Sequence, residues 1–181
     1  MNTTDNILII DLEATCWNGP IPQGQVNEII EIGICILDTH TGEITKPKGI
    51  LIKPKRSTVS PFCTELTTIT QELLDQEGIS FEDACDIVRE EYEGHYNTWA
   101  SYGDYDRNMM QRQCKIRNID YPLSQDHINV KQLFYEMQPI RRKVGMKGAL
   151  NMLNIPLEGT HHRGVDDAKN IAKILDVILE D

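Results

Sequence analysis

The clearest pattern near the start of the chain is an apolar run followed by two alternating carboxylates. The run Ile7–Ile10 is wholly apolar, and Asp11 and Glu13 follow it with Leu12 between them. An unbroken apolar run of this kind is typical of a strand that is buried on both faces. Residues two apart in a strand point to the same side, so Asp11 and Glu13 should project together from the end of the strand.

Four further strands are predicted from apolar runs separated by turn residues. A loop over residues 16–27, which contains Gly and Pro, leads to a second strand at Glu28–Leu37, and a third is predicted at Gly49–Ile52. The first third of the chain therefore resembles a β-meander. The fourth and fifth strands are predicted at Tyr96–Tyr102 and Ile128–Leu133.

Helical periodicity predicts several helices after the meander. A short helical piece surrounds Leu73 and Leu74, and Ser80 begins a capping box for the next helix. A helix is predicted from about Asp106 to Arg117, and the segment Pro139–Leu153 holds a basic loop and a short helix. The last helix, with apolar spacing sustained to Leu179, is the clearest. Strands first, then strands alternating with helices, favour an α/β fold with a mixed sheet.

Composition narrows the class of protein. The chain has 181 residues, of which 40% are hydrophobic and 25% charged, so we expect one globular domain over residues 1–181. The sequence contains no apolar run of the roughly 18 residues that a membrane span needs, and residues 1–6 do not resemble a signal peptide. We therefore expect a cytoplasmic protein without a membrane partner, and the sequence leaves its oligomeric state open.

Cysteine number and net charge exclude two further classes. Five cysteines, widely spread and without a CxxC pair, predict neither a disulfide framework nor a structural zinc site. The formal net charge of −10 argues against binding of nucleic acid through a broad basic face. An enzyme that holds a short piece of nucleic acid through metal ions and a few local cations stays compatible with this charge.

The paired carboxylates of the first strand have two interpretations. Like charges side by side at the edge of a core each disfavour the ionised form of the other. A divalent cation relieves that repulsion, and oxygen ligands suit Mg²⁺ or Mn²⁺. Alternatively, the strand ends at Asp11, and both carboxylates are solvated loop residues.

Helical periodicity selects one further acid in the 103–110 segment. Asp106 lies one turn before Met109 and Met110, whereas Asp104 leads onto polar positions. Asp106 should therefore point toward the sheet, unless it serves only as the N-cap of its helix. Asp104 stays a competing candidate.

The same test applies at the start of the last helix. Asp167 leads onto Ile171 at the edge of the apolar face, whereas Asp166 leads onto lysines. The alternative role for both acids is to complement the positive end of the helix dipole. His161 and His162 precede this helix. A histidine five residues before a metal-binding carboxylate is placed to act as a base, because its usual pKa lies near 6.5.

The order and context of these residues resemble the DEDDh-type 3′–5′ exonucleases, which include ribonuclease T and proofreading exonucleases. The set consists of Asp11, Glu13, Asp106, His162 and Asp167. Four phrases are similar to the Eri-type branch, which trims RNA 3′ ends: Asp11–Cys16, Glu28–Gly33, Phe62–Leu66 and His162–Asp167. The resemblance extends from about Ile7 to Leu179.

The resemblance implies a fold and a reaction. The fold would be RNase H-like, with a mixed five-stranded sheet and helices on both faces. Two divalent cations, Mg²⁺ or Mn²⁺, would be held by Asp11, Glu13, Asp106 and Asp167. His162 would act as the general base, because the family pattern places a small residue, here Gly164, two positions after the histidine.

The expected activity is metal-dependent removal of nucleotides from the 3′ end of single-stranded nucleic acid, RNA in preference to DNA. The resemblance implies that the backbone near Ala14 and Thr15 meets the 3′ hydroxyl. Trp17 is a candidate for stacking on a base, or else covers the core. The basic cluster around Arg141, Arg142 and Lys147 is a candidate for holding upstream phosphates, against the alternative of a solvated charge run.

Two rival interpretations remain open. One is a catalytically silent module of the same fold that binds nucleic acid or protein. The other is an enzyme restricted to very short oligonucleotides, which the acidic composition suits.

Overall fold

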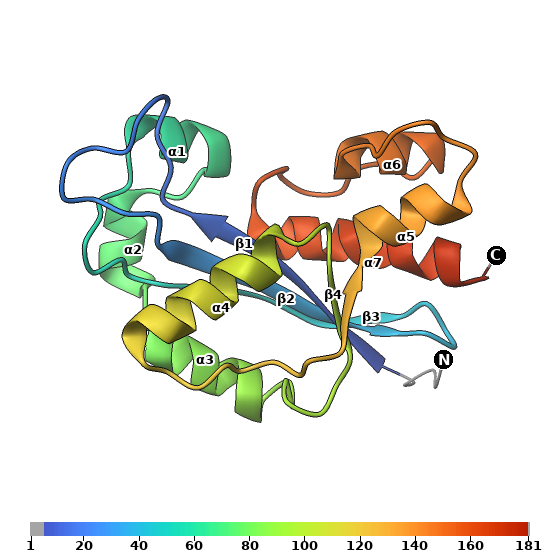
Figure 1. Cartoon of the computed structure of the whole chain (residues 1–181), viewed down its shortest axis with the longest axis horizontal. Coiled ribbons are helices and arrows are strands. Elements are labelled where there is room, and N and C mark those ends of the chain that lie inside the picture. Colours follow the sequence, from blue (N-terminus) through green and yellow to red (C-terminus); the bar gives the residue numbers. More distant parts are fainter. Residues whose placement is uncertain (1–5, 181) are drawn as a thin grey trace.

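A mixed five-stranded sheet forms the centre of the computed structural model, which describes residues 6–180 (Figure 1). The strands are β1 (Asn6–Ala14), β2 (Ile29–Asp38), β3 (Ile44–Leu51), β4 (Trp99–Ser101) and β5 (His127–Asn129). Their order across the sheet is β3-β2-β1-β4-β5. The pairs β1–β2 and β2–β3 are antiparallel, whereas β1–β4 and β4–β5 are parallel. The predicted mixed sheet is confirmed.

Helices cover both faces of this sheet. Those among residues 6–180 are α1 (Pro61–Thr67), α2 (Gln71–Glu77), α3 (Phe81–Glu90), α4 (Tyr105–Arg117), α5 (Val130–Met137), α6 (Met146–Met152) and α7 (Gly164–Glu180). Side chains of α3 and α4 belong to one apolar cluster, and those of α5, α6 and α7 to another. No helix in residues 6–180 has the length and apolarity needed to cross a membrane.

The apolar run of β1 is unbroken because both of its faces are buried. Leu8 and Ile10 pack into the cluster of α3 and α4. Ile7 and Ile9 pack into the cluster of α7. Each is at most 5% exposed. Alternate residues of the central strand therefore serve two cores, as the sequence predicts.

The prediction of a fifth strand over Ile128–Leu133 is wrong in most of its length. Strand β5 ends at Asn129, and α5 begins at Val130. The Asn129 side chain accepts a hydrogen bond from the backbone nitrogen of Gln132 at 2.9 Å, which is an N-cap. Val130 and Phe134, four residues apart, are fully buried on one helix face. Capping and helical burial outweigh the β propensity of this segment.

Two strands and one helix also differ from the predictions. Strand β3 begins at Ile44 rather than Gly49, and it tolerates Pro47 because it lies at the edge of the sheet. Strand β4 is limited to Trp99–Ser101. Helix α1 was not predicted. It begins at Pro61, and the Ser60 hydroxyl caps it by accepting from the Cys63 nitrogen at 3.0 Å.

Candidate active site

The paired acids of β1 lie on the α7 face of the sheet. Ile7 and Ile9 pack against α7, and Asp11 and Glu13 continue the same alternation. The pairing of β1 with β2 is regular as far as Glu13 and shifts between Glu13 and Ala14. Both acids therefore stand where the apolar cluster of this face ends.

Helix α7 approaches β2 so closely that a side chain does not fit between them. A Cβ atom on Gly33 would lie 1.8 Å from the backbone carbon of Gly164, the first residue of α7. The Glu31 carboxylate, fully buried on β2, accepts from the Gly164 nitrogen at 2.8 Å and pairs with Arg163. These contacts fix the first turn of α7, and thereby Asp167, beside the acids of β1.

Three carboxylates from two distant parts of the chain converge as a result. Asp11, Glu13 and Asp167 each offer an oxygen, and these oxygens lie within 4.8 Å of one another. Asp167 is 4% exposed. Its neighbour Asp166 instead pairs with Lys169 at 2.8 Å and accepts from the Thr160 nitrogen. The periodicity that favoured Asp167 over Asp166 therefore selects the residue that the fold turns inward.

Asp106, in the first turn of α4, also points inward. It is 5% exposed, and its Oδ1 accepts from the backbone nitrogen of Leu12, between the two acids of β1, at 3.0 Å. Asp104 is exposed, pairs with Arg107 at 2.8 Å and accepts from the Asn129 amide. Asp104 occupies the N-cap position without a side-chain capping bond, so Asp106 is not the N-cap.

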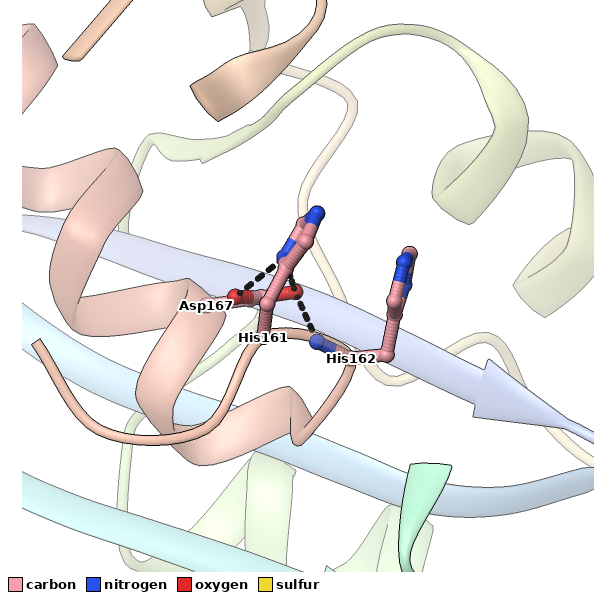
Figure 2. Close-up of side chains that lie close together, drawn as sticks. All are labelled: His161, His162 and Asp167. Atoms are coloured by element: carbon pink, nitrogen blue, oxygen red, sulfur yellow. Dashed lines mark hydrogen bonds and ion pairs between the residues drawn. The ribbon is translucent and has the colours of Figure 1, made fainter. Parts of the chain in front are cut away.

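Both histidines lie beside Asp167, in different ways (Figure 2). The His161 Nδ1 atom is 3.0 Å from Asp167 Oδ2. His162 instead donates its backbone nitrogen to that oxygen at 2.9 Å, with a left-handed φ of 67°. The two rings stack with their centroids 3.9 Å apart. No hydrogen bond within residues 6–180 engages the His162 ring, and partial burial lowers its pKa.

Burial and mutual repulsion make the ionised forms of the clustered acids unfavourable. Burial raises the pKa of Asp11 well above its usual value, and the charges of Asp106, Glu13 and Asp167 raise it further. Burial, followed by Asp167, raises the pKa of Glu13 to about 9, against which Arg163 acts in the opposite direction. Burial also raises the pKa of Asp106 to about 6, although three hydrogen bonds oppose the shift.

This donor set fits a hard divalent cation. Carboxylate oxygens are the ligands that Mg²⁺ and Mn²⁺ prefer, and a cation would remove the repulsion that raises these pKa values. The three converging oxygens come from Asp11, Glu13 and Asp167, with Asp106 close enough to act on the pKa of Asp11. The residues present therefore match the metal that the sequence predicted.

The predicted substrate residues just after β1 differ in how buried they are and in how far the protein engages their polar groups. Thr15 is fully buried, and its nitrogen, oxygen and hydroxyl bond to Glu28, Asn27 and Val26. Its polar groups thus support the loop, and Ala14 and Thr15 as substrate contacts stay predictions. Trp17 is partly exposed, as base stacking requires.

The predicted basic cluster is fully accessible. Arg141, Arg142 and Lys147 are exposed, and no ion pair among residues 6–180 involves them. Arg141 and Arg142 lie between α5 and α6, and Lys147 lies in the first turn of α6. Their contact with upstream phosphates stays a prediction.

Sequence reasoning missed three residues at the site. Glu31 was seen only as part of a motif, although it is an acid in an otherwise apolar strand and pairs in register with Glu13. His161 was set aside in favour of His162. Tyr105 is 58% exposed just before Asp106, and its hydroxyl is near enough to Asp106 and Glu13 for their charges to raise its pKa, after burial.

Comparison with known structures gives the class of protein. The fold matches that of the nuclease domain of 3′hExo, a DEDDh family member bound to rAMP, with a TM-score of 0.89 and 30% identity, covering 99% of this chain and 94% of that one. It also matches cell-death related nuclease 4 (CRN-4), with a TM-score of 0.78 and 23% identity, covering 97% and 64%. The fold is thus the RNase H-like fold of DEDDh nucleases.

The chain belongs to the exonuclease family (RNase_T), whose model matches residues 8–175. It is 31% identical over 186 residues to 3′-5′ exoribonuclease 1 of Homo sapiens, covering 98% of this chain and 53% of that protein. It is 27% identical over 181 residues to the probable 3′-5′ exonuclease KapD of Bacillus subtilis (strain 168), covering 99% and 87%. The chain thus spans about half the length of the human relative and most of the bacterial one.

Proposed function

We propose that this protein is a metal-dependent 3′–5′ exonuclease that removes nucleotides from single-stranded RNA in preference to DNA. The observation that carries the proposal is the convergence of Asp11, Glu13 and Asp167 oxygens within 4.8 Å, with Asp106 buried alongside. The relatives named 3′-5′ exoribonuclease support the polarity and the preference for RNA. We include in the proposal that residues 1–181 act as a single exonuclease domain in the cytoplasm.

The four acids would hold two divalent cations, Mg²⁺ or Mn²⁺, at the end of β1. Such ions lower the pKa of bound water and neutralise charge on the phosphoryl group. Two contacts hold the proposed metal ligands in place. Glu31 fixes the first turn of α7, which carries Asp167, and the Leu12 nitrogen donates to Asp106.

A histidine would accept the proton of the attacking water. His162 is the proposed base, because its ring is not engaged by Asp167 and its pKa lies below the usual value, which keeps it neutral and able to accept. His161 is the geometric competitor. Its Nδ1 faces the Asp167 carboxylate, so a proton on Nδ1 leaves Nε2 as the acceptor.

The terminal nucleotide would lie between the acids and the partly exposed aromatic side chains. Trp17 follows the end of β1, and Tyr105 stands beside Asp106. Either ring presents a flat face to a base, a contact that tolerates any sequence. The backbone at Ala14 completes the proposed contact with the 3′ hydroxyl.

A nuclease assay tests the proposal. Matched 5′-labelled RNA, DNA and dinucleotides are incubated with Mg²⁺ or Mn²⁺, and a ladder that shortens from the 3′ end is expected, faster for RNA. Chelation of the metal should abolish it. Absence of hydrolysis of every substrate would indicate a silent module. Hydrolysis of the dinucleotides alone would indicate an enzyme restricted to short oligonucleotides.

A matched pair of variants distinguishes the roles of the two histidines. His162→Ala is expected to lower kcat by about 10²- to 10⁴-fold, the usual contribution of a general base. His161→Ala is expected to lower it much less, because this ring only orients Asp167. Near-normal activity of His162→Ala together with loss in His161→Ala would move the base to His161.

A further inference from the structure

A cavity of about 460 Å³ lies between the 16–28 loop, residues 55–56 and the C-terminal half of α4. We call it the Arg112 pocket. The residues lining it that matter here are Ile21, Lys55, Arg56, Arg112, Ile116 and Arg117. None of these residues belongs to the acid cluster or to the predicted substrate contacts.

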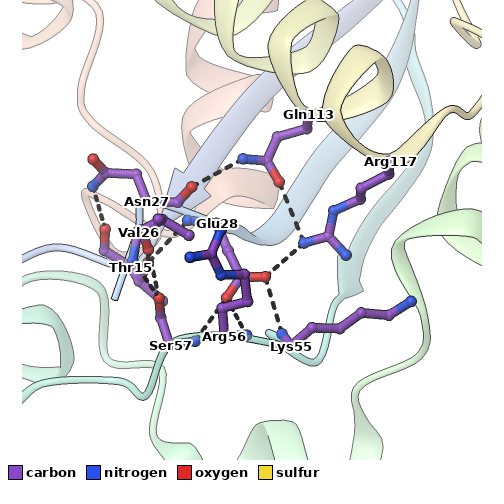
Figure 3. A network of polar contacts seen from close by, with 9 residues as sticks. All are labelled: Thr15, Val26, Asn27, Glu28, Lys55, Arg56, Ser57, Gln113 and Arg117. Carbon is purple, nitrogen blue, oxygen red and sulfur yellow. Dashed lines mark hydrogen bonds and ion pairs between the residues drawn. The ribbon is translucent and has the colours of Figure 1, made fainter. Parts of the chain in front are cut away.

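Positive charge predominates in this pocket. Its lining includes four cationic side chains and one acid, Glu28. Glu28 is 2% exposed, and its oxygens accept from the backbone nitrogens of Lys55, Arg56 and Ser57 and from Arg117 (Figure 3). Lys55, Arg56 and Arg112 are exposed, and no ion pair within residues 6–180 engages them. In a chain of net charge −10, such unpaired cations favour an anionic ligand.

Apolar surface accompanies these cations. Ile21 is 48% exposed and Ile116 is 70% exposed, and both line the pocket. A ligand that fits must combine negative charge with a flat apolar face. Nucleotides of a single strand have this combination, and proteins that hold single strands pair cations with apolar or aromatic side chains.

The pocket and the acid cluster share structural elements. Helix α4 carries Asp106 in its first turn and Arg112 six residues later, about 9 Å along the axis at 1.5 Å per residue. The 16–28 loop begins just after β1 and is tied to Thr15 through Val26 and Glu28. A strand whose 3′ end lies at the acids therefore has the Arg112 pocket within its reach.

We propose that the Arg112 pocket binds an internal nucleotide of the substrate strand, upstream of the nucleotide that is removed. The proposal rests on the proposed function for the identity of the strand. It assigns upstream binding to Lys55, Arg56 and Arg112. Helix α4 packs on the opposite side of the sheet from α5 and α6, and Arg141 and Arg142 lie between those two helices, with Lys147 in α6. Its consequence is that the pocket acts only on substrates long enough to reach it.

The first test compares substrate lengths. Arg112→Gln and the double variant Lys55→Gln/Arg56→Gln are expected to raise KM about tenfold for RNA of about 12 nucleotides, and to leave kcat/KM for a dinucleotide unchanged. Both keep the backbone nitrogens that bind Glu28. Lys115→Gln, an exposed cation on α4 outside the pocket, is the matched control and should behave as wild type. Equal losses on both lengths, or no loss on either, would overturn the proposal.

The second test does not depend on hydrolysis, so it separates this proposal from the proposed function. Fluorescence anisotropy of labelled RNA of about 12 nucleotides is measured without divalent metal at several salt concentrations. Arg112→Gln should weaken binding and lower the slope of log K against log salt by about 1. An oligo-aspartate peptide serves as the rival probe. If Arg112→Gln weakens binding of the peptide but not of RNA, the pocket is a protein-docking site and the proposal is wrong.

Discussion

Two buried acidic regions of this protein are treated in opposite ways. Glu28 is 2% exposed and receives three backbone N–H groups and the Arg117 guanidinium. Asp11 and Glu13 lie beside other acids, and burial together with those charges raises the pKa of each. The chain neutralises the first region itself and leaves the second to be neutralised from outside.

The difference separates structural charge from functional charge. A buried carboxylate is expensive unless it is paired, and the Glu28 network provides the pairing that stabilises the 55–57 loop. Asp11 and Glu13 lack such pairing among residues 6–180, where Arg163 opposes the pKa shift of Glu13 only in part. Uncompensated buried charge of this kind is typical of a site that binds a cation.

The largest expected effect is on activity. Asp11→Asn removes one of the carboxylates that would bind the metal ions. Because metal ions supply several kcal/mol of transition-state stabilisation, kcat is expected to fall by about 10³-fold or more. The metal-free variant should be at least as stable as wild type, because a buried group whose ionisation is unfavourable is replaced by a neutral amide. Steady-state kinetics and urea unfolding measure the two quantities. Loss of stability without loss of activity would reverse the assignment of the two regions.

Glu28→Ala should show the opposite behaviour. Removal of this carboxylate leaves buried N–H groups and Arg117 without their partner, and the free energy of unfolding is expected to fall by about 3 kcal/mol. Activity of the folded fraction on a dinucleotide should stay close to wild type. Glu91→Ala, which breaks the exposed pair with Lys48, is the control and should cost about 0–1 kcal/mol. Equal costs in the two variants would contradict the structural role of Glu28.

Metal should stabilise the protein through the acid cluster alone. Mn²⁺ at about 100 times its Kd is expected to raise the free energy of unfolding by about 2.7 kcal/mol. The increment should persist in Glu91→Ala and disappear in Asp167→Asn. Thermal unfolding with and without Mn²⁺ measures it. A full increment in Asp167→Asn would show that the ion binds elsewhere.

The pH dependence of the metal-free protein gives a smaller effect. The pKa of Glu13 is raised to about 9 in the folded state, whereas an unfolded glutamate titrates near 4.3. Folded Glu13 therefore binds more protons between these values, and this one group should make the stability fall as pH rises, by at most about 1.4 kcal/mol per pH unit. Urea unfolding in chelator compares wild type with Glu13→Gln. The variant should lose the contribution of Glu13 to the slope, and an equal slope in both proteins would refute the shift.

The smallest expected effect concerns the loop between α5 and α6. Arg142 is exposed and lines no part of the Arg112 pocket. Because exposed charges are screened by salt, Arg142→Gln should weaken binding of RNA of about 12 nucleotides by only about twofold at physiological salt. Fluorescence anisotropy measures RNA binding by Arg142→Gln and by Arg112→Gln side by side. A larger loss in Arg142→Gln would return upstream binding to this loop.

Periodicity predicted the site best where one face of an element is buried. It selected the inward acids Asp106 and Asp167 over their neighbours Asp104 and Asp166, because α4 and α7 each bury one face. The run of β1 likewise revealed a strand between two cores. What periodicity reports is orientation, and whether these acids bind metal stays a prediction.

Contacts between segments far apart in the chain could not be predicted from the sequence. The close approach of Gly33 to Gly164, and the hydrogen bond that the Gly164 nitrogen donates to Glu31, join β2 to α7, and no local pattern encodes them. The fifth strand was predicted too long because the N-cap role of Asn129 competes with the β propensity of the residues after it. The choice between His161 and His162 depends on which ring contacts Asp167, and that contact forms only in the folded loop, where His162 has a left-handed φ.

We propose that the acids of β1 and α7 bind divalent cations together. Isothermal titration of Mn²⁺ into wild type, Asp11→Asn, Asp167→Asn and Glu91→Ala tests it most directly. We expect binding with proton release in wild type and Glu91→Ala, because Asp11 and Glu13 must lose protons to bind. We expect loss of binding in both aspartate variants. Equal Mn²⁺ binding in all four proteins would contradict it.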